Sequence, residues 1–170
     1  MDDRLTVAQS LRHARHDFLN ELQMIKLNLD LGRTDRAQAL IRTYAEAAMH
    51  QSRLSALSMP ETEEWLLTAG WRFPELRLVM SCEAKRAPRE LDAVLCSWLE
   101  AFAENAKEAF SDAWPYPVEL HIMEADGRFS LELSGPGDWS SLILDSSQLA
   151  IGKACGSDRS KVEIHAQMEG

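Results

Sequence analysis

The residues of this sequence whose types and spacing favour chemistry lie around His16. Arg12 precedes this histidine by four residues, Asn20 follows it by four, and Asp17 comes directly after it. Residues four apart share one face of a helix, so Arg12, His16 and Asn20 are expected to line up. A neutral imidazole is a nucleophile at pH 7, while an arginine and an amide suit phosphoryl oxygens. The pattern predicts a phosphoryl acceptor on a helix; the alternative is an ordinary surface histidine.

An uninterrupted helix must position these side chains. No glycine or proline occurs from Thr6 to Leu31, and apolar residues recur with the spacing of a helical seam, at Leu11, Phe18, Leu22, Ile25 and Leu29. At 100° per residue these five lie within about 60° of Leu22, and His16 lies about 120° from the stripe centre. We therefore expect a buried stripe with His16 on its exposed flank.

A second helix is expected to follow directly. Gly32 suits the position after a helix end, Thr34 or Asp35 suits the cap of the next helix, and that helix should end near Leu57. The short connection makes the two helices antiparallel. A hairpin alone leaves an apolar flank uncovered, so we expect a homodimer with a four-helix bundle. The alternative is that the rest of the chain covers this flank.

The charge distribution predicts where the hairpin ends. Residues 1–57 carry 8 Lys/Arg and 7 Asp/Glu, whereas residues 58–170 carry 10 and 20. Pro60 follows this change in composition. We therefore predict two domains, a dimerising phosphoacceptor hairpin over residues 1–58 and an α/β domain over residues 59–170.

The second domain has the pattern of a sheet covered by helices. Alternating apolar residues predict strands, Asp126-Gly127 is a strong hairpin signal, and Pro88 is expected to open a long helix. The expected strands are Leu76–Cys82, Val118–Met123, Arg128–Leu133 and Val162–Ala166, with a short helix at residues 63–67. The whole chain is thus predicted to be α+β, with helices on one face of the sheet.

Composition excludes several other classes of protein. A net charge of -9 argues against nucleic acid as a partner, and no apolar run approaches the roughly 18–20 residues that span a bilayer. The N-terminus lacks the pattern of a signal peptide, and Cys82, Cys96 and Cys155 form no CxxC pair. The remaining histidines lack metal-ligand spacing. We expect a cytoplasmic protein without a structural metal, a membrane span or a nucleic-acid partner.

The sequence RHARHDFLNELQ (residues 12–23) and its continuation MIKLNLDL (residues 24–31) resemble the phosphoacceptor helix of sporulation phosphotransferases and related sensor-kinase helical domains. The resemblance implies that His16 is phosphorylated, that Asp17 and Asn20 assist it, and that the hairpin dimerises. It also implies phosphoryl transfer between the receiver domains of two response regulators. In that case the chain binds no cofactor, and Mg²⁺ is held by the regulator.

The second domain resembles the ATP-binding domain of sensor histidine kinases. Residues 104–109 (ENAKEA) resemble its N-box, and residues 133–137 (LSGPG) resemble its D-x-G-x-G box with Leu133 in place of the adenine-binding aspartate. A second glycine-rich box and its lid are not visible, which predicts a degenerate ATPase-like domain. The alternatives to a phosphotransferase are an ATP-dependent autophosphorylating kinase and a non-catalytic dimeric scaffold. Asn20 also suggests a phosphatase activity.

Overall fold

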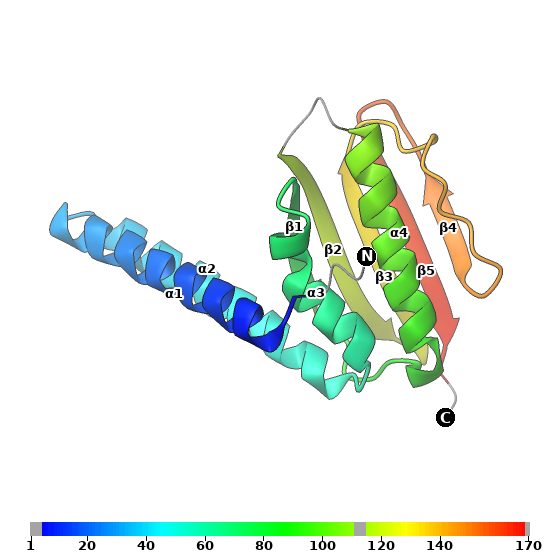
Figure 1. Ribbon diagram of the computed structural model, residues 1–170, viewed down its shortest axis with the longest axis horizontal. Helices are drawn as coiled ribbons and strands as arrows, with labels where there is room; N and C mark the ends of the chain where they lie inside the picture. The colour runs from blue at the N-terminus through cyan, green and yellow to red at the C-terminus, as the bar shows by residue number, and fades with distance from the viewer. Residues whose placement is uncertain (1–4, 111–114, 169–170) are drawn as a thin grey trace. The chain divides into compact units, whose positions relative to one another are not determined.

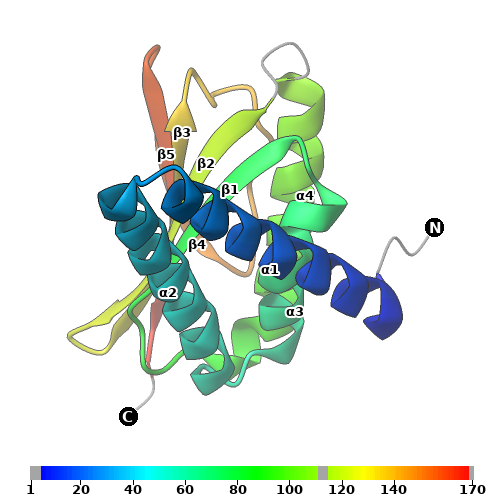
Figure 2. The ribbon, with the colours of Figure 1, turned by 90° about the vertical axis from the view of Figure 1, so that its left-hand side faces the viewer.

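The computed structural model describes residues 5–110 and 115–168, which form a helical hairpin and a sheet covered by helices (Figures 1 and 2). The chain divides into two compact units between Met49 and His50, so the last turns of the second helix belong to the second unit. The predicted α+β class is confirmed. In chain order the elements are α1 (Val7–Asp30), α2 (Thr34–Ala56), α3 (Pro60–Arg72), β1 (Leu76–Cys82), the 3-10 turn η1 (Arg89–Leu91), α4 (Asp92–Ala109), β2 (Tyr116–Ala125), β3 (Arg128–Pro136), β4 (Ala150–Ala154) and β5 (Arg159–Gln167).

Local sequence signals set the ends of α1. The Thr6 hydroxyl accepts a hydrogen bond from the Gln9 amide, and the Gln9 side chain accepts one from the Thr6 amide. This reciprocal capping box satisfies two amides that would otherwise lack partners. After the helix, Gly32 has a φ of 69°, which glycine adopts without steric cost. Thr34 is already the first residue of α2, so neither it nor Asp35 precedes the helix as expected.

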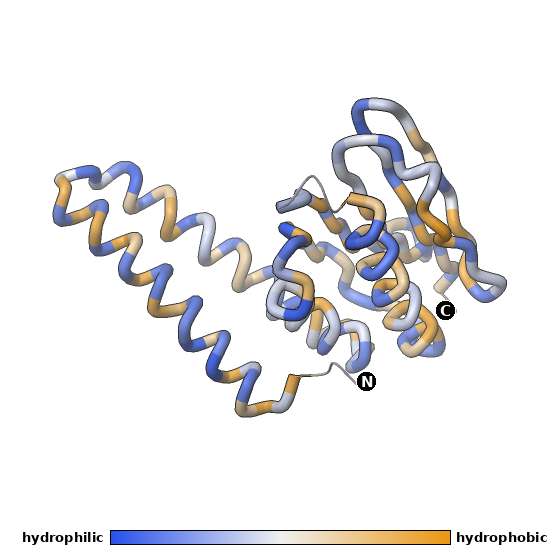
Figure 3. Tube along the Cα trace, turned by 45° about the horizontal axis from the view of Figure 1, so that its top comes forward, coloured by the Kyte–Doolittle hydropathy of each residue, from blue (hydrophilic) through white to orange (hydrophobic). Residues whose placement is uncertain are grey.

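The predicted burial of the α1 stripe is wrong within the single chain. Leu11 and Phe18 are each 58% exposed, and Leu22 and Leu29 are 46% and 51% exposed. Of the five stripe residues only Ile25 is partly covered. The two helices lie closest near their connection and diverge away from it (Figure 3). Because α2 covers α1 only near the connection, around Asn28 and Ala37, most of the stripe stays in contact with solvent.

The hairpin is best packed close to its connection. Asn28 on α1 and Ala37 on α2 are buried there. The Asn28 side-chain amide donates to the Met24 carbonyl at 2.8 Å, which gives this buried polar group a partner within its own helix.

The sheet has the strand order β1-β2-β3-β5-β4. β1 pairs in parallel with β2, and every other neighbouring pair is antiparallel. β1 has its predicted bounds, while β2, β3 and β5 extend beyond theirs. Asp126 and Gly127, both with positive φ, form the predicted turn. β4 was not predicted, because its sequence AIGKA has too little alternating hydrophobicity to indicate a strand.

The helices α3 and α4 cover one face of the sheet (Figure 1). Strand residues such as Leu120 and Leu131 and helix residues such as Leu99 and Phe102 are almost fully buried in one core. α3 is longer than the expected short helix, and α4 begins at Asp92 after η1 rather than at Pro88.

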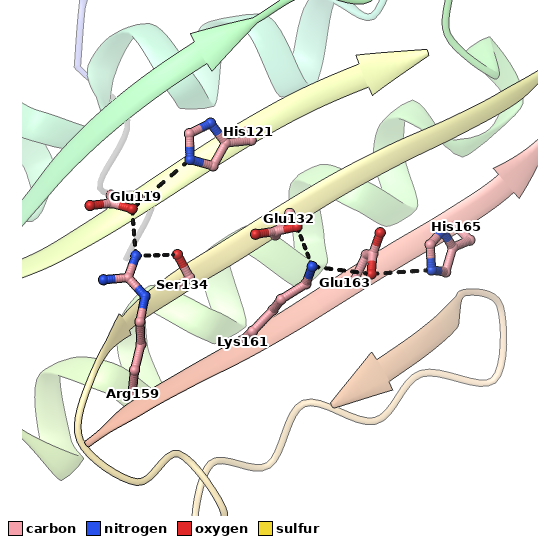
Figure 4. A network of polar contacts seen from close by, with 8 residues as sticks. All are labelled: Glu119, His121, Glu132, Ser134, Arg159, Lys161, Glu163 and His165. Atoms are coloured by element: carbon pink, nitrogen blue, oxygen red, sulfur yellow. Dashed lines mark hydrogen bonds and ion pairs between the residues drawn. The ribbon is translucent and has the colours of Figure 1, made fainter. Parts of the chain in front are cut away.

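The opposite face of the sheet is lined by polar and charged side chains (Figure 4). Glu132 and Glu163 are directly opposite each other on β3 and β5, and Lys161 forms ion pairs with both, at 2.5 and 3.6 Å. Hydrogen bonding to Glu132 raises the pKa of Lys161. This charge pairing offsets the repulsion between the two glutamates.

Candidate functional site

His16 lies on α1 beside two polar side chains. Its imidazole Nδ1 lies 3.2 Å from Asp17 Oδ1 and 3.2 Å from Asn20 Nδ2, and Nε2 lies 3.5 Å from Asn20 Nδ2. The His16 side chain is 71% exposed. The structure therefore brings together three of the four predicted site residues around an imidazole that is open to solvent.

The fourth predicted residue, Arg12, lies one helical turn before His16 and is exposed. Within the residues that the structure covers, it forms no hydrogen bond or ion pair. Its guanidinium is thus not held against the imidazole, but it lies on the same face of α1 as a cation one turn away.

The Asp17 contact determines which ring nitrogen is available. A carboxylate only accepts hydrogen bonds, so the Asp17 contact requires a hydrogen on His16 Nδ1. The tautomer with hydrogen on Nδ1 puts the accepting lone pair on Nε2, which the Asn20 side-chain amide faces at 3.5 Å. An Asn20 amide hydrogen bond to Nδ1 would need the opposite tautomer, so the two contacts exclude each other. With Asp17 engaged, the Asn20 amide can donate to Nε2 of the ring or to a group that approaches this nitrogen.

In the second unit, Leu133 lies where the kinase pattern has an aspartate. It is 1% exposed and lies between Leu120 and Val162 in the sheet. An aliphatic side chain accepts no hydrogen bond from an adenine amine, and leaving such a group unpaired costs about 1–3 kcal/mol.

The segment after the glycine box packs onto the core as a strap, residues 138–149. Trp139, Leu142, Leu144 and Leu149 of this strap are buried. Trp98 Nε1 donates to the Leu144 carbonyl at 2.8 Å, so the strap is fixed to α4. The sequence Asp138-Trp139-Ser140 is typical of loop and cap chemistry, and the tryptophans of this domain are expected to contribute to packing. The Ser140 amide donates to Asp138 and Trp139 is buried, so both expectations are confirmed for this segment.

The N-box residue Asn105 has a local partner. Its side-chain amide donates to the Ala101 carbonyl, one turn earlier in α4, at 2.7 Å. This contact is typical of a polar residue on a helix surface. Nothing in this geometry connects Asn105 with Leu133 or with the strap.

Among residues 5–110 and 115–168, no three His, Cys, Asp or Glu side chains are placed to hold a metal ion. In the same part of the chain, no helix combines the length and apolar composition needed to cross a bilayer.

Comparison with known proteins finds similarity in the hairpin. Residues 1–57 match the family described as Sensor_kinase_SpoOB-type, alpha-helical domain, so the resemblance stated from the sequence is confirmed for this part of the chain. Over 62 residues the chain is 42% identical to sporulation initiation phosphotransferase B of Bacillus subtilis (strain 168). This match covers 36% of the chain and 32% of the relative, about a third of each protein.

Solved structures of kinases resemble the chain at low sequence identity. Histidine kinase AdeS of Acinetobacter baumannii is 11% identical with a TM-score of 0.44, and the match covers 91% of this chain and 98% of that one. The histidine kinase domain of a blue-light activated kinase from Erythrobacter litoralis EL346 is 14% identical with a TM-score of 0.47. That match covers 86% of this chain and 83% of the other.

Proposed function

We propose that this chain is a histidine phosphotransferase of a sporulation-type phosphorelay, in which His16 carries a phosphoryl group between aspartates of two response regulators. The observation that carries the proposal is the exposed imidazole of His16, held by Asp17 and accompanied by Asn20, in a segment similar to a named phosphotransferase. The receiver domains of such regulators are cytoplasmic, so we propose the same compartment for this chain.

The chemistry follows from the lone pair of Nε2, which becomes available when the Asn20 amide turns from this nitrogen to the incoming phosphoryl group. This nitrogen attacks the phosphorus of an aspartyl phosphate, a P–N bond forms, and the P–O bond to the aspartate breaks with its electron pair leaving on the carboxylate. The phosphorylated ring keeps its hydrogen on Nδ1 and is positively charged, so the adjacent Asp17 carboxylate stabilises it. Attack by the aspartate of the second regulator reverses these changes and restores the neutral imidazole.

Arg12 and Asn20 are proposed to act on the transferred group. Both lie within one helical turn of His16 on its own face, where a cation and an amide donor suit the equatorial oxygens of the phosphoryl group. The chain itself is proposed to bind no cofactor, and Mg²⁺ is expected in the acidic pocket of the regulator.

A homodimer is proposed from the exposed stripe of α1. Leu11, Phe18, Leu22 and Leu29 place apolar side chains in solvent along one face, and a stripe of this length on a two-helix hairpin is typical of a bundle interface. A second copy related by a two-fold axis would cover it. The mass in solution, measured by light scattering, tests this directly.

The second unit is proposed to use no ATP. Leu133 removes the adenine acceptor, and the strap carrying Trp139 packs beside the glycine box. These features oppose the alternative of an autophosphorylating kinase, which predicts labelling of the protein by γ-labelled ATP in the absence of any regulator.

The test is transfer of label from a phosphorylated response regulator to the purified protein. The expected product survives alkali and is lost in acid, as phosphohistidine is, and His16→Gln abolishes it. His13→Gln is the matched control, because His13 is also an exposed histidine of α1. Labelling that persists in His16→Gln would overturn the assignment. Regulator binding without any labelling of the wild type would identify a scaffold instead.

A further inference from the structure

The strand β1 forms one free edge of the sheet (Figure 1). Directly after the strand, the Glu83 amide donates to the Ile122 carbonyl of β2 at 2.8 Å. Successive residues of a strand turn their backbone groups to opposite sides. The amides and carbonyls of Leu78, Met80 and Cys82 therefore point outward, away from the sheet.

Two side chains of α2 occupy the outward groups of Cys82. The Cys82 amide donates to His50 Nδ1 at 3.2 Å, and the Arg53 guanidinium donates to the Cys82 carbonyl at 3.1 Å. Because Arg53 supplies the donor for the carbonyl, the lone pair of Nδ1 can serve the amide. His50 and Arg53, called the edge clamp below, thus offer Cys82 the acceptor and the donor that a neighbouring strand would offer. All three residues belong to the second unit.

The outward groups of Leu78 and Met80 have no such partners. Within residues 5–110 and 115–168, neither residue forms a hydrogen bond on the outer side of β1. Val79, between them, is 57% exposed. Unpaired backbone groups beside an exposed apolar side chain are a template for pairing with another chain.

The edge strand at the other side of the sheet, β4, carries its own protection. It has only five residues and includes Lys153, and short strands and lysines discourage edge pairing. β1 has seven residues, LRLVMSC, without lysine, proline or glycine. Its one charged residue, Arg77, lies near the end opposite Cys82. Protection of this edge near Cys82 therefore has to come from outside the strand.

Two copies of β1 would match each other about Val79. In an antiparallel pair centred there, Leu78 of one copy lies opposite Met80 of the other, and these are the residues whose outward groups are unpaired. Cys82 would then lie opposite Leu76 of the second copy. The edge clamp occupies the place that this part of the second strand would take.

We propose that the edge clamp is an autoinhibitory contact, which keeps β1 from pairing with β1 of a second copy of this chain. The edge is blocked while both side chains are bound to Cys82, and it opens when they leave. This pairing uses only residues of the second unit, so it is distinct from the dimer proposed through the α1 stripe. It does not depend on phosphoryl transfer.

The experiment compares two double variants of the full chain, His50→Ala/Arg53→Ala and Gln51→Ala/Lys85→Ala. The second is the matched control, because it also changes α2 and removes one positive charge. Gln51 and Lys85 are exposed, and Lys85 lines the same groove as Arg53. Light scattering measures the mass of each variant over a range of concentrations, and circular dichroism shows whether it is folded.

The clamp variant is expected to form a species of twice the wild-type mass, with a dissociation constant for this step at least about tenfold below that of the wild type and the control. Adding Val79→Lys should restore the wild-type mass, because two lysines would lie directly opposite each other in the pair. An unchanged mass in the folded clamp variant would overturn the proposal. Association that Val79→Lys does not reverse would also overturn it, since another surface would then be responsible.

If the double variant does not fold, His50→Ala and Arg53→Ala are measured singly. Each removes one partner of Cys82 and leaves the other in place, so association in the same direction but weaker is expected. Val79→Lys should reverse it again. The wild-type mass in both single variants would then contradict the autoinhibitory role of the clamp.

Discussion

The indole of Trp139 lies against the backbone of Gly135, in the space where another residue would carry a β-carbon. An ideal β-carbon on Gly135 would lie 2.6 Å from Trp139 Cζ2 and 2.9 Å from the Pro117 carbonyl oxygen. Trp139 is fully buried, and its ring centroid lies 5.4 Å from that of Phe102. Its Nε1 donates to the Tyr116 hydroxyl at 2.8 Å. The glycine of this box therefore permits core packing by a tryptophan.

Gly135→Ala is expected to destabilise the second unit by about 1–3 kcal/mol, the usual cost of an added methyl group in a close-packed site. Urea unfolding followed by tryptophan fluorescence measures this change. Gly152→Ala is the control. Gly152 lies in the edge strand β4, and a β-carbon there would have no neighbouring atom closer than 3.9 Å. Equal stability of the two variants would contradict the packing role of Gly135.

Asp92 caps α3 from a neighbouring element. Its two carboxylate oxygens accept the backbone amides of Thr62 at 2.8 Å and Glu61 at 3.0 Å, and the residue is buried. Asp92→Ala leaves both amides without these partners and is expected to cost about 1–3 kcal/mol of unfolding free energy. Glu90→Ala, at an exposed position two residues earlier, should change the stability little. If Asp92→Ala lowers the free energy of unfolding no more than Glu90→Ala does, water replaces the carboxylate as the partner of the two amides.

Two hydrogen bonds lower the pKa of the Glu124 carboxylate. The one from the Arg86 side chain has the larger effect, and the one from the Lys85 backbone amide has a smaller effect. A carboxylate with a depressed pKa adds stability above its unfolded pKa of about 4.3 and loses that contribution as the pH falls through the folded value. Arg86→Gln removes the charged guanidinium that lowers the pKa of Glu124. This pKa is therefore expected to rise, which NMR titration of the Glu124 side chain measures. Lys85→Gln removes the same charge but keeps the amide, so the pKa should rise less.

The features predicted from sequence depend on short-range geometry. His16, Asp17 and Asn20 meet because positions one and four residues apart are neighbours on any helix. The turn at Asp126-Gly127 likewise needs only the backbone freedom of two residues. Each of these signals acts within a few residues of the chain.

The features that were missed depend on distant segments. The stripe of α1 has the spacing of a buried seam, but whether Leu11 or Phe18 is buried depends on which surface meets it. β4 forms because β5 offers a pairing edge, although Gly152 and its neighbours carry little strand signal. A tryptophan is expected to pack, but the sequence does not show that Trp139 packs against Gly135 and Phe102. These are tertiary effects, which local patterns do not encode.

Asp17 is the site residue whose role is most directly testable. Its Oδ1 lies 3.2 Å from His16 Nδ1, and in the proposed reaction its negative charge would offset the positive charge that the ring gains with the phosphoryl group. Asn at this position keeps an oxygen acceptor but not the charge. Asp17→Asn is therefore expected to lower the rate of phosphoryl transfer by at least about tenfold, while the Kd for the receiver domain changes little.

The matched control for Asp17→Asn is Glu21→Gln, which removes one negative charge from the same helix one turn later. The two variants change the net charge of α1 equally, so a difference between their rates reports contact with the imidazole rather than the general field of the helix. The lifetime of the phosphorylated protein gives a second readout, since loss of the stabilising charge should shorten it in Asp17→Asn alone. Equal rates and lifetimes in the two variants would show that Asp17 contributes only its charge to the surface of α1 and would contradict its proposed action on the His16 ring.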